Sequence, residues 1–316
     1  MSILAVGLTP TVQRTLRFAR LELGAVNRAR EVLVTASGKA VNVARVARLL
    51  GGESRLIQFL GGDTGRFLAG ALEEQGIAHE PVWVEDDAPT RTCTTLLPEN
   101  GPATELVEEA RPVSANDVAA LEAAVLEHLP SASALCLSGS FPPGVPDDFY
   151  ARLVRAAHEE NVPALVDAQR LPLRAALAAR PFLVKPNLEE AAATLALPLS
   201  GDGERDALHA IDALLAAGAA WALVSMGKTG ALLGGAESGE RWRIEPPHVE
   251  AVNPIGSGDS LLAGLAVARE RRASVPDAAA FGTACAAANC LTETSGVVRP
   301  ADVTELLPQV RCTRLS

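Results

Sequence analysis

Short apolar runs alternate with amphipathic stretches along most of the chain. Each run is rich in aliphatic residues and is bounded by Gly, Pro or polar residues, which is typical of a strand buried on both faces. Strands that alternate with helices predict an α/β protein with a mostly parallel sheet covered by helices on both sides. The runs predicted to be strands are 3–8, 55–60, 134–137, 164–166, 182–184 and 220–225.

Between these runs, apolar residues recur at helical spacing. One helix is predicted to begin near Lys39, because apolar side chains follow at i, i+3, i+4 and i+7 until the chain reaches Gly51. A second is predicted over 64–75, just before Gly76. A third is predicted to start at Ser114, where the pattern Ser-x-x-Asp resembles a capping box.

Two polar, extended stretches interrupt this alternation, at about 9–35 and 88–110. Because they contain few helix signals, we interpret them as strands of a small flap, or lid, beside the main sheet. The alternative is that both are ordinary long loops. Later in the chain, 231–234 and 241–245 predict antiparallel strands, and the tail after Pro276 is predicted to be mostly helical.

The composition is that of a globular protein with a large core. The chain has 316 residues, of which 48% are hydrophobic and 21% charged, so intrinsic disorder is excluded. Aromatic residues make up 3%, so the core must be largely aliphatic. The net charge of −10 argues against general nucleic-acid binding, because a phosphate backbone requires a basic face. A small local anion site is still allowed.

The cysteines and the apolar runs bear on the cellular compartment. The five cysteines are scattered and lack a Cys-x-x-Cys pair, so we expect a reduced, cytoplasmic setting with neither a disulfide framework nor structural zinc. The chain opens without a basic leader, and no clean apolar stretch reaches the ~18–20 residues of a spanning helix. We therefore expect no membrane partner. The cysteines are Cys93, Cys136, Cys285, Cys290 and Cys312.

The most informative segment for chemistry is 253–260, in which small residues surround Asp259 and an apolar helix follows at once. Backbone N–H groups at a helix start lack intrahelical partners, and the helix dipole adds partial positive charge. Glycines let a phosphate approach the backbone closely. Asp259 would then sit beside a bound polyphosphate and take a proton from an attacking hydroxyl. The alternative is that Asp259 is simply a helix N-cap.

A second small-residue turn, 36–44, also enters a helix and places Lys39 and Asn42 on its first turn. Lys39 can meet an anion, and Asn42 can hydrogen-bond to hydroxyl groups. The alternative is that both are ordinary surface residues.

A third turn, 185–190, follows a predicted strand. Asn187 and Glu190 are three residues apart and so point to one side of a first helical turn. One carboxylate and one amide suit Mg²⁺ that keeps most of its waters. The alternative is that the two residues cap the helix.

A fourth segment, 226–229, ends like a phosphate-binding P-loop, but we reject that interpretation. The motif requires a glycine where the chain has Ala222, and a strand rather than a helix is predicted to follow. No Gly-x-Gly-x-x-Gly follows the first predicted strand, so a dinucleotide-dependent oxidoreductase is not expected.

Taken together and in order, these motifs resemble those of the ribokinase-like (PfkB) carbohydrate kinases over essentially the whole chain. The turn 37–42 and the Gly-Ser-Gly-Asp turn at 256–259 look like the two signatures of that family. Asn253-Pro254 and Asn27-Arg28 look most like its phosphosugar branch, which contains 1-phosphofructokinase and tagatose-6-phosphate kinase. The motifs between the two signatures are 138–144, 185–190 and 225–230.

The resemblance implies a single domain over 1–316 with a three-layer α/β/α core and a β-strand lid. It also implies ATP and Mg²⁺, a ketose-phosphate acceptor and a homodimer packed through the lid. The first expectation is phosphorylation of fructose 1-phosphate to fructose 1,6-bisphosphate. The alternatives are a kinase for tagatose 6-phosphate, a plain sugar or a nucleoside, and a sugar-phosphate-binding protein without turnover.

The resemblance also assigns roles to individual residues. Asp259 would be the general base, and Gly256, Ser257 and Gly258 would supply backbone donors to the transferring phosphoryl group. Asn187 and Glu190 would hold hydrated Mg²⁺. The nucleotide would meet Lys185, Asn187, Ser225, Gly227, Gly230, Gly258 and Asn289. The sugar would meet Gln13, Gly38, Lys39, Asn42 and Ser138, while Arg28 and Arg91 would grip its phosphate; the alternative for these two arginines is that they are exposed lid charges.

Three segments depart from the family pattern, and one of them is the stretch Asp167-Ala168-Gln169-Arg170, where members usually carry a small polar run after the Asp. Gln13 stands where members usually carry an Asp that binds sugar hydroxyls, and its amide is a neutral donor and acceptor. Ser37 and Ala40 replace two glycines where backbone usually lies against the substrate. The catalytic half of the expected site therefore matches the family better than the acceptor half does.

Overall fold

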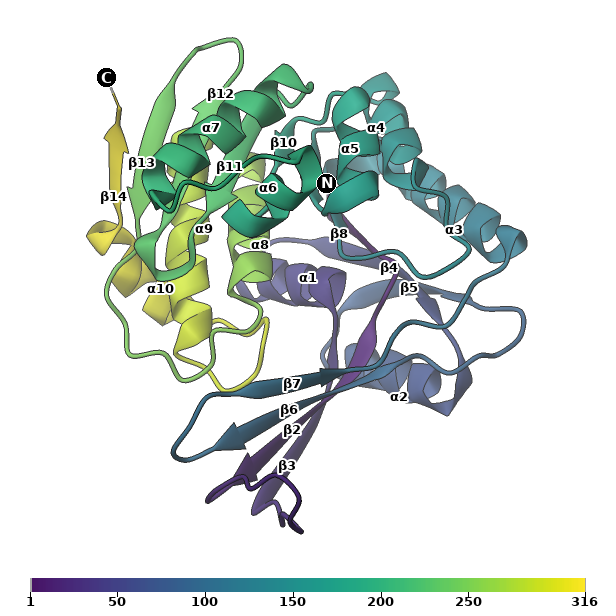
Figure 1. Ribbon diagram of the computed structural model, residues 1–316. Coiled ribbons are helices and arrows are strands. Elements are labelled where there is room, and N and C mark those ends of the chain that lie inside the picture. Colours follow the sequence, from purple (N-terminus) through teal and green to yellow (C-terminus); the bar gives the residue numbers. More distant parts are fainter. Residues whose placement is uncertain (1, 316) are drawn as a thin grey trace.

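The computed structural model describes residues 2–315 and has three layers, with a central sheet between two layers of helices (Figure 1). The predicted α/β fold is confirmed. In sheet order the strands are β14 (Arg311–Arg314), β13 (Arg241–Glu245), β12 (Ala231–Gly235), β11 (Trp221–Ser225), β10 (Leu183–Val184), β9 (Ala164–Asp167), β8 (Ala132–Ser138), β1 (Ser2–Gly7), β4 (Ser54–Leu60) and β5 (Ala78–Trp83). The strands from β5 to β11 pair in parallel, and β12 to β14 continue the sheet antiparallel.

Successive residues of the parallel strands face opposite helix layers, which explains why these strands are continuously apolar. In β1, Ile3 and Ala5 pack in one buried cluster, and Leu4 and Val6 pack in the other. One layer consists of α1 (Lys39–Leu49), α2 (Gly62–Glu74), α8 (Ser257–Glu270), α9 (Val275–Cys290) and α10 (Pro300–Leu306). The opposite layer consists of α3 (Ala115–His128), α4 (Phe149–Glu159), α5 (Arg170–Ala178), α6 (Leu188–Leu195) and α7 (Gly203–Ala216).

A second, four-stranded sheet projects from the body of the molecule as a lid (Figure 1). In sheet order its strands are β3 (Glu31–Ser37), β2 (Thr11–Phe18), β6 (Thr92–Pro98) and β7 (Thr104–Val107). Strand β3 leads directly into α1 through Gly38, whose φ of 122° favours glycine and whose added Cβ would lie 3.0 Å from the Pro10 Cα. The first turn of α1 therefore lies at the root of the lid.

The predicted and observed elements differ mainly at the edges of the sheet. Ser114 and Asp117 form the predicted capping box at the start of α3, and β12 and β13 form the predicted antiparallel pair. Strands β5 and β14 were not predicted, because β5 contains Pro81 and β14 is polar, as edge strands often are. Within residues 2–315, no helix is long and apolar enough to cross a membrane.

Candidate active site

A cleft of about 1370 Å³ lies where the carboxyl ends of the parallel strands meet the inner face of the lid. Open α/β sheets bind their ligands at this edge. Fifteen of the eighteen residues singled out from the sequence line it: Gln13, Gly38, Lys39, Asn42, Arg91, Lys185, Asn187, Glu190, Ser225, Gly227, Gly230, Gly256, Ser257, Gly258 and Asp259. Arg28, Ser138 and Asn289 do not.

Asp259 is held at the start of α8, facing α1. It is the third residue of the helix and is 6% exposed, and its Oδ2 accepts a hydrogen bond of 2.8 Å from Asn42 Nδ2. The N-cap residue is Gly256 in the left-handed conformation, with φ 83°. The alternative that Asp259 is the N-cap is therefore wrong, and its carboxylate is directed into the site.

Burial raises the pKa of Asp259 to about 6. The neighbouring Asp167 carboxylate also raises this pKa, whereas Lys39, the Asn42 hydrogen bond and Lys185 lower it. A carboxylate with this pKa is charged at neutral pH but is a stronger base than an ordinary aspartate. These are the properties that a general base for an alcohol requires.

A second buried carboxylate, Asp167, lies at the end of β9 between two lysines. Its Oδ1 is 3.3 Å from Lys39 Nζ, and its Oδ2 is 3.1 Å from Lys185 Nζ. Burial alone would raise the pKa of Asp167, but Lys185 and Lys39 outweigh it and hold the pKa below its ordinary value. Asp167 in turn raises the pKa of Lys39. Lys39 is therefore cationic in the site.

The two lysines differ in what they can reach. The Lys39 side chain is 40% exposed and the Lys185 side chain 4%, so Lys39 is the cation available to a ligand in the cleft. The sequence singled out both lysines but not Asp167 as a site residue. The available signal was its position directly after the predicted strand 164–166, where parallel strands present functional side chains.

Asn187 and Glu190 form a capping box at the start of α6. Asn187 Oδ1 accepts from Glu190 N at 2.7 Å, and Glu190 Oε2 accepts from Asn187 N at 2.9 Å. Both residues also line the cleft. Capping uses one oxygen of the Glu190 carboxylate, so the other is available to a hydrated cation. Within residues 2–315, no group of three or more His, Cys, Asp or Glu side chains could enclose a metal.

The part of the cleft that was expected to meet the nucleotide contains Ser225 and the glycines that follow β11. Gly227–Thr229 forms a short 3₁₀ turn, and β12 follows it. A P-loop would lead into a helix, so the rejection of that motif is confirmed.

Asn289, expected near adenine, is instead fully buried and does not line the cleft. Its Nδ2 donates to Ile255 O at 2.9 Å, while its Oδ1 accepts from Gly296 N and from the Ser260 hydroxyl. The amide is used to hold the turn before α8. It is therefore not free to contact a base.

The part of the cleft that was expected to meet the sugar combines the lid with the first turn of α1. Gln13 Nε2 donates to Thr95 Oγ1 at 2.8 Å across β2 and β6, which leaves Gln13 Oε1 as an acceptor in the cleft. Ser138, expected to contact the sugar, is 1% exposed at the end of β8, beneath the cleft floor. It lies one strand from Asp167 in register but, unlike Asp167, does not line the cleft.

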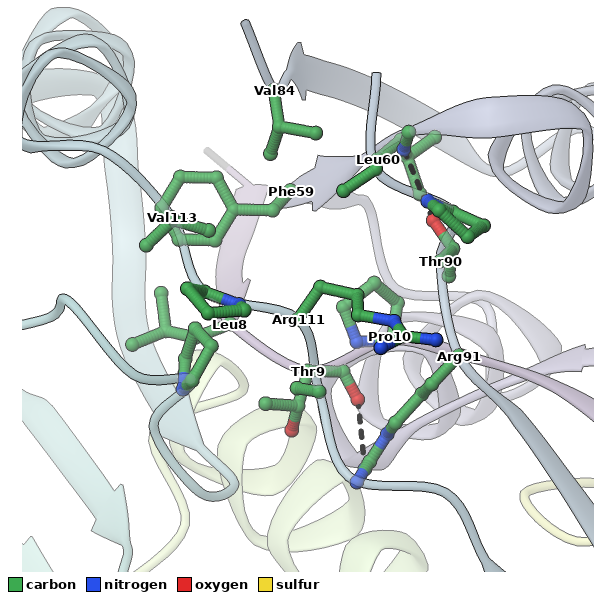
Figure 2. Close-up of a pocket in the computed structure, with 16 residues that line it drawn as sticks. Leu8, Thr9, Pro10, Phe59, Leu60, Val84, Thr90, Arg91, Arg111 and Val113 are labelled. Carbon is green, nitrogen blue, oxygen red and sulfur yellow. Dashed lines mark hydrogen bonds between the residues drawn. The ribbon is translucent and has the colours of Figure 1, made fainter. Parts of the chain in front are cut away.

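The two arginines expected to bind phosphate lie in different places. Arg91 lines the cleft, and its Nη2 donates to Thr9 O at 3.1 Å (Figure 2). It also borders a hollow of about 40 Å³ at the root of the lid, where Figure 2 shows Arg111 beside it. Arg28 is exposed in the connection between β2 and β3 and does not line the cleft. Within one chain it is an exposed lid charge.

A parallel sheet that faces a lid across a cleft, with a buried carboxylate at a helix start, is the arrangement of the ribokinase-like kinases. Residues 2–301 match the pfkB family carbohydrate kinases, and the chain belongs to this family. It is therefore an ATP-dependent sugar kinase.

Solved structures agree with this assignment. Phosphofructokinase-2 from Escherichia coli, solved with potassium, is 26% identical with a TM-score of 0.89 over 98% of each chain, and it has also been solved with fructose-6-phosphate. A possible 1-phosphofructokinase from Thermotoga maritima is 22% identical with a TM-score of 0.89 over the whole of both chains. Arabidopsis thaliana ribokinase, solved with ribose and ATP, is 20% identical with a TM-score of 0.75 over 97% of this chain and 99% of that one. The last two likenesses concern the fold alone.

Proposed function

We propose that the protein transfers the terminal phosphoryl group of ATP to a hydroxyl group of a phosphorylated ketose, with fructose 1-phosphate as the first candidate. The observation that carries this proposal is the Asp259 carboxylate, buried at the helix start and hydrogen-bonded to Asn42 inside the cleft. It is a base placed where a helix N-terminus attracts phosphate. The phosphofructokinase-2 complex with fructose-6-phosphate supports a phosphosugar as the acceptor.

In this mechanism Asp259 takes the proton of the acceptor hydroxyl as that oxygen attacks the terminal phosphorus of ATP. The backbone N–H of Gly258 belongs to the first turn of α8, so it has no intrahelical acceptor and can stabilise the charge on the transferring group, whereas the N–H of Ser257 already donates to Pro254 O at 3.2 Å. Lys39, which pairs with Asp167 and is the more exposed of the two lysines, adds positive charge to the cleft. ADP then leaves, and the proton on Asp259 passes to solvent.

Magnesium is expected with ATP, and the residues present fit a hydrated ion. Glu190 offers one carboxylate oxygen outside its capping bond, and Asn187 lies beside it. Mg²⁺ in kinases keeps several waters and binds through one or two carboxylates together with substrate phosphates. When bound, the ion would neutralise charge on the phosphates.

The acceptor half supports an anionic sugar. Arg91 is a cation at the edge of the cleft, and neither Arg91 nor its neighbour Arg111 is in an ion pair within the described residues. Gln13 and Thr95 are neutral groups of the lid wall, whereas Glu105, opposite Thr95 in register, adds a carboxylate to the cleft lining. The same neutral Gln13 favours the second candidate, a kinase for an unphosphorylated sugar or a nucleoside.

The experiment that tests the proposal measures ADP release over a panel of hexose phosphates, sugars and nucleosides, with wild type and Asp259→Asn. We expect fructose 1-phosphate to be the best acceptor, and Asp259→Asn to lower its turnover by roughly 10²–10⁴, the usual contribution of a positioned base. Asp63→Asn, which changes a fully exposed carboxylate on α2, is the matched control and should keep wild-type turnover. Normal turnover by Asp259→Asn would overturn the mechanism. A sugar or nucleoside preferred to every phosphosugar would select the second candidate.

We also propose a homodimer that packs through the outer face of the lid and resides in the cytoplasm. The side chains of this face alternate with those lining the cleft, and Val32, Val34 and Leu106 are 48%, 41% and 54% exposed. A second copy of the same sheet would cover these side chains isologously. The cytoplasmic setting rests on the five cysteines, all of which are free thiols.

A further inference from the structure

Arg45 is a buried cation in the middle of α1 that no assignment above uses. It is 6% exposed, and among the ion pairs of residues 2–315 none involves it. Burial lowers the pKa of Arg45 to about 10, so the side chain is still cationic at neutral pH. A buried charge without a counter-ion is tolerated only if its hydrogen bonds are well satisfied, and this one is held entirely by neutral acceptors.

Those acceptors come from four different parts of the chain. Arg45 Nε donates to Gln75 Oε1 at 2.7 Å at the end of α2. Arg45 Nη2 donates to Ala36 O near the end of the lid strand β3. Nη1 is shared between Ser295 O at 3.4 Å and Asn42 Oδ1 at 3.2 Å. The planar guanidinium therefore joins the root of the lid, the loop after α9 and the Asn42 side chain.

The contact with Asn42 determines which way its amide faces. Arg45 Nη1 and, at 3.4 Å, the Ser37 hydroxyl both donate to Asn42 Oδ1, so the opposite end, Nδ2, faces Asp259. Gly296 closes the remaining side, since a Cβ there would lie 2.5 Å from the Asn42 side chain. Asn42 therefore has a single orientation in which it can donate to the Asp259 carboxylate.

We propose that Arg45 is a positioning residue that orients the Asn42 amide and, through it, the Asp259 carboxylate. The proposal rests on the function given above, in which Asp259 is the base. Without Arg45, the Asn42 amide is free to rotate, and its hydrogen bond to Asp259 is weakened or lost. Because that bond favours the charged carboxylate, Asp259 would take up a proton at a higher pH.

The other charged groups that face Asp259 are Lys39 from α1, Lys185 from the turn after β10 and Asp167 from β9. None of them is hydrogen-bonded to Arg45. Their effect on Asp259 should therefore be the same in wild type and in Arg45 variants. Arg45 is itself not among the groups whose charge acts on the Asp259 pKa, and Arg45→Lys keeps the charge in place, so a shift seen in both Arg45 variants reports on Asn42.

The test compares Arg45→Gln with Arg48→Gln, which removes an exposed arginine of the same helix that also bonds to Gln75 but is not linked to Asn42. The first measurement follows the Asp259 carboxyl carbon by NMR during a pH titration, in folded protein and without substrate. We expect Arg45→Gln to raise the Asp259 pKa by about 0.5–1 unit and Arg48→Gln to leave it unchanged. The acid limb of the kcat/KM profile should move by the same amount, a loss of about 2- to 5-fold near pH 6 with a smaller loss at pH 8.

Two further variants keep the proposal testable if Arg45→Gln folds poorly. Arg45→Lys keeps the positive charge but lacks the planar guanidinium and its fixed set of N–H donors. It should raise the Asp259 pKa by a smaller amount than Arg45→Gln does. Asn42→Ala removes the intermediary, so adding Arg45→Lys to it should shift the Asp259 pKa no further. An unchanged pKa in the single Arg45 variants, or an equal shift with and without Asn42, would overturn the positioning role. If the Asp259 pKa shifts as expected but Asp259→Asn keeps normal turnover, the kinase mechanism fails and the positioning role stands.

Discussion

The Asp259 carboxylate shows how burial tunes a single side chain. Burial raises its pKa to about 6, above the ordinary value of 3.8, and only the deprotonated form can accept the proton of a hydroxyl group. We expect kcat/KM to be level above about pH 7 and to fall about tenfold per unit well below pH 6. Initial rates from pH 4.5 to 8.5 at fixed ionic strength measure this pH dependence of kcat/KM. An acid limb near pH 4 would mean that the buried carboxylate is not the group that titrates.

At the same scale, the two lid arginines give a direct comparison. Arg91 lines the cleft and Arg28 does not, although the motif pattern assigns both to the substrate phosphate. Arg91→Ala should raise KM for a phosphosugar about tenfold or more, as loss of a charge-assisted bond does, with less effect on KM for ATP. Arg28→Ala should raise KM much less. Equal effects from steady-state kinetics would mean that Arg28 reaches the substrate, from this chain or from a second copy.

Among the elements, the α8–α9 pair depends on two glycines that let the helices approach closely. A Cβ on Gly282 would lie 2.5 Å from Leu261 O, and a Cβ on Gly264 would lie 2.9 Å from the Gly282 Cα. Gly282→Ala must therefore separate the helices, and we expect it to destabilise the fold by about 1–3 kcal/mol, as overpacking does.

Gly70→Ala is the matched control, because Gly70 lies inside α2 with no atom within 4 Å of an added Cβ. There the same substitution should stabilise by about 0.5–1 kcal/mol through helix propensity. Urea unfolding of wild type, Gly282→Ala and Gly70→Ala measures the free energy of unfolding of each and so both effects. If Gly282→Ala were as stable as Gly70→Ala, the close approach of α8 to α9 would not be needed to hold the helix that carries Asp259.

For the whole molecule, the lid face is the surface that a second copy should cover. Val34→Glu places a charge in the middle of this apolar face, next to Arg14 in register, and should convert dimers to monomers. Leu199→Glu changes an equally exposed apolar residue far from the lid strands in sequence and should leave the dimer intact. Light scattering after size exclusion gives the mass. A monomeric wild type, or a dimer unaffected by Val34→Glu, would refute packing through the lid.

Much of this arrangement is already present in local patterns. The alternation of apolar runs and helical spacings predicted the layers, and Ser114-x-x-Asp117 predicted a helix start, because these signals depend on neighbours a few residues apart. The small-residue turns around Gly38 and Gly256 marked two walls of the cleft for a similar reason, since a backbone with positive φ nearly requires glycine.

Contacts between distant residues could not be obtained in that way. Asn42 and Asp259 are 217 residues apart, and Arg45 bonds to a residue 250 positions away. The inward turn of Asn289 and the depth of Ser138 likewise follow from how strands and helices stack. Periodicity shows which side of a strand or helix a residue occupies. The residue that it contacts on a neighbouring element is set by tertiary packing. The contacts that give the cleft its chemistry were therefore decided by the tertiary structure.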